Sequence, residues 1–377
     1  MVSAITGADA PLVTEMDRTS SGKIHFEVLD GLRGTAAFLV VLFHIMEMAY
    51  IADPARNLLR HAYLAVDFFF GLSGFVVGYA YDDRWKRMTL GEFFKLRLVR
   101  LHPLVVLGVF IGLLCYLANP FFRGVDQTSP QAILVTVVAG LLLLPSPVLP
   151  GRFTDTHSMN GPHWTLLQEY VANIAYALVL RRLATSVLAV LTVVAAVILF
   201  ASSVRMSGIA SGYGWDTFWM APVRLAFPFL SGLWLYRMRD RLRMPRLGML
   251  PLSIILLAAF AVPALPKHGG IDLNGIYDAL CVIILFPIVI LSGAHSEIGR
   301  GMVAICKGAG RLSYPIYVTH YPFLYVYLDF VLHGNPSAEA VAVSGLLLVP
   351  FILLLGWIAA RYWDEPIRAY LRRRPRQ

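Results

Sequence analysis

The chain has 377 residues, of which 58% are hydrophobic and only 15% charged, and its mean hydropathy is +0.66. Soluble globular proteins carry roughly a quarter charged residues, so this composition excludes a water-soluble protein with a polar shell. The net charge of +9 comes from short basic clusters between apolar stretches, a pattern typical of membrane loops rather than of a nucleic-acid surface. The three isolated cysteines indicate neither a disulfide framework nor a zinc site, and no metal is expected.

The polar first 25 residues lack the pattern of a cleavable signal peptide. We expect residues 1–25 to be a polar cytoplasmic segment, 26–362 a transmembrane domain and 363–377 a basic cytoplasmic tail. Apolar stretches of about 20 residues predict membrane helices. They lie at 31–50, 62–81, 102–118, 163–180, 184–202, 216–236, 248–265, 274–294, 314–332 and 338–360.

The basic loops predict the orientation of these helices, because Lys and Arg accumulate on the cytoplasmic side. The three basic segments are 82–101, 237–246 and 361–377, and placing them inside puts 119–130 outside. The proline-interrupted stretch 131–149 then cannot be a simple crossing, so we predict a re-entrant or interfacial segment that lines a cavity. The expected fold class is an all-α membrane protein with about ten transmembrane helices and both termini cytoplasmic.

The first predicted span carries polar residues on one face. Arg33 and His44 are eleven residues apart, which on an α-helix places them within about 20° of one face and roughly 16 Å apart along the axis. Glu47 lies on that face too. A snorkelling arginine and a locally bonded histidine would need no function, but this grouping of polar residues within one membrane span favours a functional site.

The next span contains Asp67 and Ser73, and its residues Gly74 and Gly78 have the spacing of closely packed helices. In the cytoplasmic stretch after it, Arg97-x-x-Arg100 projects two guanidinium groups to one side of a helix. Such a pair can grip phosphate groups in a fork. The positive-inside rule alone would also account for it.

Two later spans carry polar stripes at helical spacing. Glu169 follows Trp164 in the span at 163–180 and is too deep for snorkelling to explain, which favours a functional or buried-network role. Near the other end of the chain, Ser313, Tyr317 and His320 fall on one helix face.

Taken together, these motifs resemble the acyltransferase-3 family of integral membrane acyltransferases. The matching pieces are Leu29-Asp30-Gly31-Leu32-Arg33-Gly34 with His44, Phe69-Phe70-Gly71-Leu72-Ser73-Gly74-Phe75, Arg97-x-x-Arg100 before Pro103, Trp164-Thr165-Leu166 with Glu169, Ser313-Tyr314-x-x-Tyr317-x-x-His320, and Glu365-Pro366. Members typically move an acyl group, commonly acetyl, from cytoplasmic acyl-CoA to a hydroxyl of a cell-envelope carbohydrate.

The resemblance implies that His44 is the essential histidine, that Arg33 is its motif partner, and that Arg97 and Arg100 contact the CoA phosphates. His44 would act as general base, with Glu169 or Glu47 orienting its imidazole. The remaining candidate substrate or supporting residues are Glu47, Asp67, Ser73, Trp164, Ser313, Tyr317 and His320. Thr165 stands where the family more often has serine.

The expected function is therefore an O-acyltransferase of the bacterial cytoplasmic membrane, with acetyl-CoA as donor and a carbohydrate or lipid-linked glycan as acceptor. Acylation of a small molecule such as a macrolide is an alternative within the same class. A proton-coupled transporter that relays protons through His44, Asp67 and Glu169, or a polysaccharide export chaperone, is an alternative of another class. The sequence does not indicate an oligomeric state.

Overall fold

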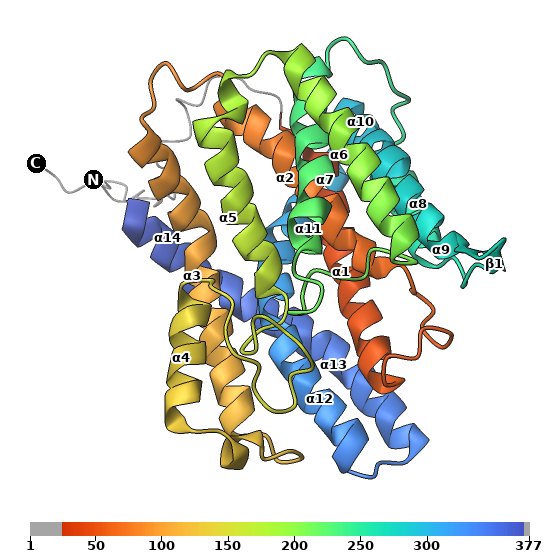
Figure 1. Ribbon diagram of the computed structural model, residues 1–377. Helices are drawn as coiled ribbons and strands as arrows, with labels where there is room; N and C mark the ends of the chain where they lie inside the picture. The colour runs from red at the N-terminus through yellow and green to blue at the C-terminus, as the bar shows by residue number, and fades with distance from the viewer. Residues whose placement is uncertain (1–24, 373–377) are drawn as a thin grey trace, which may run out of the picture.

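The computed structural model describes residues 25–372, which form helices joined by loops and one small hairpin (Figure 1). The α-helices are α1 (Glu27–Ala49), α2 (Ala65–Tyr81), α3 (Leu90–Leu117), α4 (Pro130–Leu141), α5 (His163–Leu178), α6 (Thr185–Arg205), α7 (Met220–Met238), α8 (Met249–Phe260), α9 (Leu273–Leu280), α10 (Phe286–His295), α11 (Arg300–Thr319), α12 (Tyr321–His333), α13 (Ala338–Ile358) and α14 (Glu365–Arg372). The π-helical segments η5 (Cys281–Leu285) and η6 (Ala359–Asp364) make α9–α10 and α13–α14 continuous. The antiparallel strands β1 (Lys267–His268) and β2 (Ile271–Asp272) form the hairpin.

Within the described residues, six helical segments are long and apolar enough to cross a membrane, which confirms an all-α membrane protein. They are Glu27–Ala49, Ala62–Tyr81, Leu90–Leu117, Thr185–Arg205, Leu273–His295 and Ala338–Arg372. The span predicted at 314–332 is wrong as a single helix, because the chain there passes from α11 to α12 at His320. Pro322 lies in the first turn of α12, where its missing N–H leaves no helical hydrogen bond unmade. Most of residues 1–25 and the last five residues of the predicted tail lie outside the described range.

Helices α2 and α7 pack backbone against backbone, as the glycine spacing in α2 predicted. A Cβ atom added at Gly74 would lie 2.1 Å from the carbonyl oxygen of Phe229, and one at Gly232 would lie 2.0 Å from that of Gly71. The approach of α1 to α11 is similarly close, since a Cβ at Gly34 would lie 2.5 Å from Cβ of Ala309. Small residues thus let these two pairs of helices form a closely packed frame.

In residues 130–178, helices α4 and α5 both run antiparallel to α3. The loop between them turns back toward the C-terminal end of α3 before α5 begins. The Tyr116 hydroxyl lies 2.7 Å from Thr128 Oγ1 just before α4 begins, and Gly140 packs on Val109 near the end of α4. The following loop returns to the Tyr116 end, where the Arg152 guanidinium lies 5.0 Å from that ring. The chain thus goes out and back relative to α3 in this region, and the re-entrant segment near 131–149 stays a prediction. The chain then continues as α5 beside the N-terminal half of α3 (Figure 1).

The α2–α7 contact gives a first testable prediction. Gly74→Ala should lower the melting temperature of the purified protein in detergent, because the added methyl group forces the two helices apart, and overpacking of this kind costs about 1–3 kcal/mol. Gly91→Ala is the matched control, since a Cβ at this exposed helical position meets no atom within 4 Å. It should hold or slightly raise the melting temperature. Equal melting temperatures for the two variants would show that the contact does not limit stability.

Candidate active site

A cavity of about 610 Å³ lies between α1, α2, α3, α5, α11 and the segment η6–α14. Along α2 its lining extends from Tyr81 to Val66, a distance of roughly 20 Å on a helix. Apolar and hydroxyl-bearing side chains such as Phe69, Thr165 and Tyr317 form one end, and charged side chains of α11 and α14 form the other. The cavity is therefore long, with one ionic end and one mainly apolar end.

Positive charge predominates in the lining. Its cations are Arg33, Arg97, Arg100, Lys307, Arg311, Arg368 and Arg372, and its carboxylates are Asp30, Glu169, Asp364 and Glu365. Among residues 25–372, seven cations facing four carboxylates leave a positive surplus, which attracts an anionic ligand into a low-dielectric space.

Arg33 is held in place by three hydrogen bonds from its guanidinium. Nε donates to Ser313 Oγ at 3.0 Å, and Nη2 donates to Asp30 Oδ1 at 3.1 Å and to the Gly310 carbonyl oxygen at 2.8 Å. The structure thus brings Arg33 and Ser313, both predicted site residues, together across the α1–α11 contact. Arg33 lines the cavity and at the same time ties its walls to each other.

Arg97 and Glu169 form an ion pair in the cavity wall. Arg97 Nη2 lies 2.6 Å from Glu169 Oε1, which also accepts a hydrogen bond from Ser73 Oγ at 3.3 Å. Of the two carboxylates that we expected to orient His44, Glu169 is therefore engaged elsewhere. Its position joins α5 to α2 and α3 and balances one of the two arginines that the sequence analysis treated as a pair.

Arg100 differs from Arg97 although both line the cavity. Within residues 25–372 its guanidinium has no hydrogen-bond or ion-pair partner, whereas Arg97 is paired and its side chain is only 5% exposed. A guanidinium presents five N–H donors and matches phosphate oxygens in a bidentate fashion. Arg100 is thus the cation of the predicted pair that is free to bind an anion.

Glu47 orients His44. It is one of the two carboxylates that the sequence analysis proposed for this role. His44 Nδ1 lies 2.8 Å from Glu47 Oε2, one helical turn further along α1. Because the carboxylate is an acceptor, Nδ1 carries the proton and the neutral ring keeps its lone pair at Nε2. Neither residue lines the 610 Å³ cavity.

His320 lies beside His44, with the two ring centroids 5.6 Å apart. It is fully buried, and its Nδ1 donates to the Tyr317 carbonyl oxygen at 2.8 Å. Its Nε2 has no hydrogen-bond partner in the described part of the chain. The structure therefore brings together two imidazoles whose Nδ1 atoms are both bonded to protein oxygens, although they are far apart in the sequence.

Tyr317 lies between the cavity and the two imidazoles. Its ring centroid is 5.8 Å from that of Phe69, which also lines the cavity, and 5.9 Å from that of His320, which does not. Its hydroxyl lies 3.0 Å from Thr165 Oγ1. Tyr317 and Phe69 thus form the wall on the histidine side of the cavity.

Asp67 and Trp164, also predicted as site residues, hold a buried arginine that the sequence analysis missed. Arg224 Nη2 lies 2.6 Å from Asp67 Oδ2, and its guanidinium lies 5.4 Å from the Trp164 ring. Neither Asp67 nor Trp164 lines the cavity. The sequence did contain a signal for this pair. Arg224 lies inside the span predicted at 216–236, and an arginine within a membrane span requires a partner.

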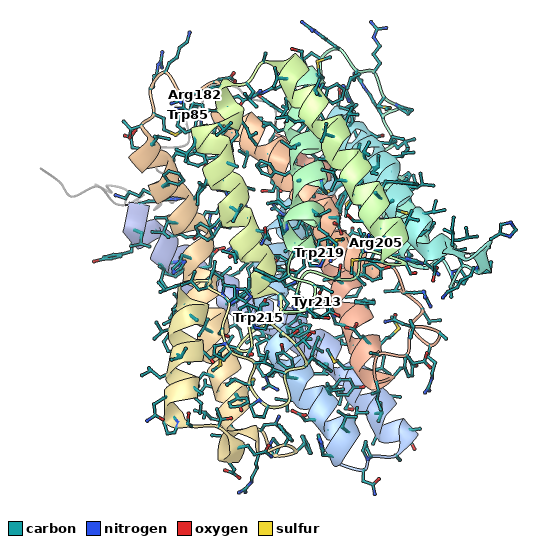
Figure 2. The ribbon with its side chains drawn as sticks, viewed as in Figure 1. Trp85, Arg182, Arg205, Tyr213, Trp215 and Trp219 are labelled. Atoms are coloured by element: carbon teal, nitrogen blue, oxygen red, sulfur yellow. The ribbon has the colours of Figure 1, made fainter. Side chains whose placement is uncertain are left out.

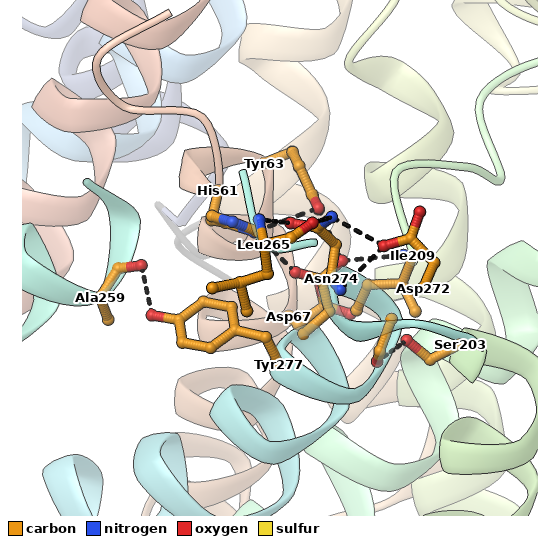
Figure 3. Close-up of polar contacts among 12 residues, drawn as sticks. His61, Tyr63, Asp67, Ser203, Ile209, Ala259, Leu265, Asp272, Asn274 and Tyr277 are labelled. Atoms are coloured by element: carbon orange, nitrogen blue, oxygen red, sulfur yellow. Dashed lines mark hydrogen bonds and ion pairs between the residues drawn. The ribbon is translucent and has the colours of Figure 1, made fainter. Parts of the chain in front are cut away.

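A second buried polar group was also missed (Figure 3). Asp278 Oδ1 lies 2.8 Å from His61 Nδ1, and Asp278 Oδ2 accepts hydrogen bonds from the Tyr63 hydroxyl at 2.6 Å and the Ile209 amide at 3.1 Å. This group connects the segment before α2, the loop after α6 and helix α9. Its residues do not line the cavity.

The fold and site define a membrane protein whose positively charged cavity lies next to a pair of histidines. The chain belongs to the acyltransferase-3 family, whose acyltransferase domain it matches over residues 26–365. It is therefore a membrane acyltransferase that transfers groups other than aminoacyl groups.

The chain is similar to two further proteins, one of which is named as an acyltransferase. The chain is 26% identical over 393 residues to Acyltransferase MdmB of Streptomyces mycarofaciens, covering 92% of this chain and 93% of that protein. It is 37% identical over 167 residues to Protein 2 in picA locus of Rhizobium radiobacter, covering 40% of this chain and 81% of that protein. No solved structure matches the chain.

The Asp67–Arg224 pair predicts a specific pattern of stability. Asp67→Leu should lower the melting temperature sharply, because removing one partner of a buried ion pair costs about 3–5 kcal/mol. Asp67→Leu combined with Arg224→Met should recover most of the loss, since no unpaired charge remains. Asp126→Leu, at an exposed position, is the control. A double variant no more stable than the single variant would contradict this account.

Proposed function

We propose that this protein transfers an acyl group, in the simplest case acetyl, from cytoplasmic acyl-CoA to a hydroxyl of a cell-envelope carbohydrate. The observation that carries the proposal is Arg100, a guanidinium that has no hydrogen-bond or ion-pair partner within residues 25–372 and lies in a cavity with surplus positive charge. The phosphates of CoA are anions of the kind that such a group binds. The apolar length of the cavity suits the thin arm that connects the nucleotide to the thioester.

The proposed orientation places the ionic end of the cavity in the cytoplasm of a bacterial cell. The basic stretch at 82–101 and the basic tail both contribute to that end, and the positive-inside rule puts both inside. In this proposal the chain crosses the membrane ten times and both termini lie in the cytoplasm. The donor then enters from the side on which acyl-CoA is made.

In the proposed reaction, His44 Nε2 takes the proton of the acceptor hydroxyl as its oxygen attacks the thioester carbonyl. The new C–O bond forms, the C–S bond breaks, and the imidazolium returns its proton to the departing thiolate. Glu47 keeps the proton at Nδ1 throughout, which leaves Nε2 as the base. Since Phe69 and Tyr317 lie between the cavity and His320, the thioester must pass these two rings to reach His44.

The transporter alternative receives little support from the same contacts. A proton relay through Asp67 and Glu169 needs carboxylates that can take up and release protons. Both are already held at 2.6 Å by arginines of neighbouring helices, Asp67 by Arg224 and Glu169 by Arg97. These two carboxylates therefore suit a structural role better than a relay.

The role of His44 is tested by His44→Ala, which should reduce acyl transfer in proteoliposomes about 100-fold or more, because a general base is lost. Glu47→Gln should give a smaller loss, since the imidazole remains but its carboxylate partner does not. His333→Ala, at the exposed end of α12, is the control and should match the wild type. Activity of His44→Ala within about threefold of wild type at equal protein abundance would exclude His44 as the base.

The donor site is tested by Arg100→Ala, which should raise the KM for acetyl-CoA about tenfold or more, because a bidentate phosphate contact is lost. Arg100→Lys should restore part of the affinity, since it keeps the charge without the fork. Lys95→Ala, an exposed cation of the same stretch that does not line the cavity, controls for topology. Full rescue by lysine, or a change only in protein level, would mean that Arg100 acts as a topology signal.

A further inference from the structure

Three exposed aromatic side chains lie on two loops that contact each other. Phe153 belongs to the loop between α4 and α5, and Tyr213 and Trp215 belong to the loop between α6 and α7. These side chains are 55%, 43% and 51% exposed, respectively. Figure 2 shows Tyr213 and Trp215 close together, near Trp219 at the start of α7. We call Phe153, Tyr213 and Trp215 the aromatic ledge.

Hydrogen bonds to the α4–α5 loop hold the α6–α7 loop and its two aromatic ledge residues in place. The backbones of the two loops are joined by hydrogen bonds from the Thr156 amide to the Tyr213 carbonyl at 2.9 Å and from the Trp215 amide to the Thr154 carbonyl at 3.0 Å. The indole Nε1 of Trp215 donates to the Ser146 carbonyl at 3.0 Å, which fixes the ring. A preorganised aromatic surface loses little conformational entropy when it binds a ligand.

Buried charges hold the other end of the same loop. Asp278 accepts the Ile209 amide, and Arg224 Nη1 donates to the Ser211 carbonyl at 2.8 Å. Both anchors lie just before Tyr213 in the chain. The polar group of Figure 3 and the Asp67–Arg224 pair thus position the ledge as well as the helices.

The ledge lies next to the histidine pair. Gly214, which lies between the two aromatic ledge residues of its loop, pairs with Asp155, and Asp155 accepts a hydrogen bond from the Tyr325 hydroxyl. The ring of Tyr325 packs edge-on against Tyr321 at 4.9 Å, and Tyr321 packs edge-on against His44 at 5.0 Å. A molecule lying on the ledge is therefore close to the proposed base.

The position of the ledge residues and their hydrogen bonds distinguish the ledge from a membrane-interface belt, in which aromatic rings at helix ends face lipid headgroups. Trp219 at the start of α7 fits that description. The ledge residues lie on loops instead, and the indole N–H of Trp215 is used by the protein itself. Exposed polar groups accompany the rings, since Thr154 Oγ1 donates to Asp216 Oδ1 at 3.2 Å. Aromatic faces with a carboxylate beside them suit a pyranose, which has an apolar face and hydroxyl edges.

We infer that the aromatic ledge is the platform on which a pyranose ring of the acceptor stacks while one of its hydroxyls reaches His44. This inference rests on the proposed function and assigns the acceptor side of the site to Phe153, Tyr213 and Trp215. The ledge residues position the sugar and take no part in proton transfer.

Binding is tested by saturation-transfer NMR on the full-length protein in nanodiscs, with maltoheptaose, cellohexaose and chitohexaose as probes. At least one should receive saturation from the wild type, and Trp215→Leu should weaken its apparent affinity about tenfold. Trp215→Phe keeps a stacking face without the indole hydrogen bond and should stay within about threefold. Trp357→Leu, at an exposed aromatic position on α13, is the control and should bind as wild type. No saturation of any probe, or equal affinity of wild type and Trp215→Leu, would overturn the inference.

Transfer of label from acetyl-CoA to a bound probe separates this inference from the proposed function. Trp215→Leu should raise the acceptor KM and leave the donor KM unchanged, because the ledge contributes binding away from the reacting bonds. Acyl transfer with an unchanged acceptor KM would refute the ledge alone. Sugar binding that depends on Trp215, without any consumption of acetyl-CoA, would refute the proposed function alone. A purely structural role of Trp215 would instead reduce protein abundance and would impair the Phe variant as much as the Leu variant.

Discussion

The arrangement of this protein depends on how it accommodates one guanidinium in its interior. Arg224 is 2% exposed, and an unpaired charge in such surroundings is costly. Asp67 neutralises it, and the backbone carbonyls of Tyr63 and Ser211 accept its other donors. These contacts fix α2 and α7 in register with the loop after α6. One ion pair thus positions both a wall of the cavity and the loop that carries the aromatic ledge.

The arginines that line the cavity differ in what their guanidinium groups bind. Arg33 and Arg97 give their hydrogen bonds to protein groups, so they join helices and define the shape of the lining. Arg100, a few residues further along α3, has no such partner in residues 25–372. Its N–H donors are therefore open to an anion that enters the cavity.

Contacts within one helix could be predicted from the sequence, whereas contacts between helices could not. Helical spacing placed Glu47 next to His44, and hydropathy located most of the membrane helices. The contacts of Glu169 with Arg97 and of His320 with His44 depend on how α3, α5, α11 and α1 pack, which no spacing in the chain encodes. The break between α11 and α12 at His320 was missed for the same reason. Hydropathy shows one continuous apolar stretch there, whereas the break depends on packing against neighbouring helices.

The rings of Phe69 and Tyr317 have a consequence for the cell as well as for catalysis. A bacterial membrane stores energy as a voltage, and each elementary charge that leaks across it dissipates about 2.3 kcal/mol per 100 mV. An enzyme that takes its donor from one face of the membrane and its acceptor from the other would dissipate this voltage through ion leakage if both sides were open at the same time. The rings of Phe69 and Tyr317 pack against each other and form the apolar wall on the histidine side of the cavity. In the proposed reaction, the side chains that the acyl arm has to pass would therefore also insulate the membrane between turnovers.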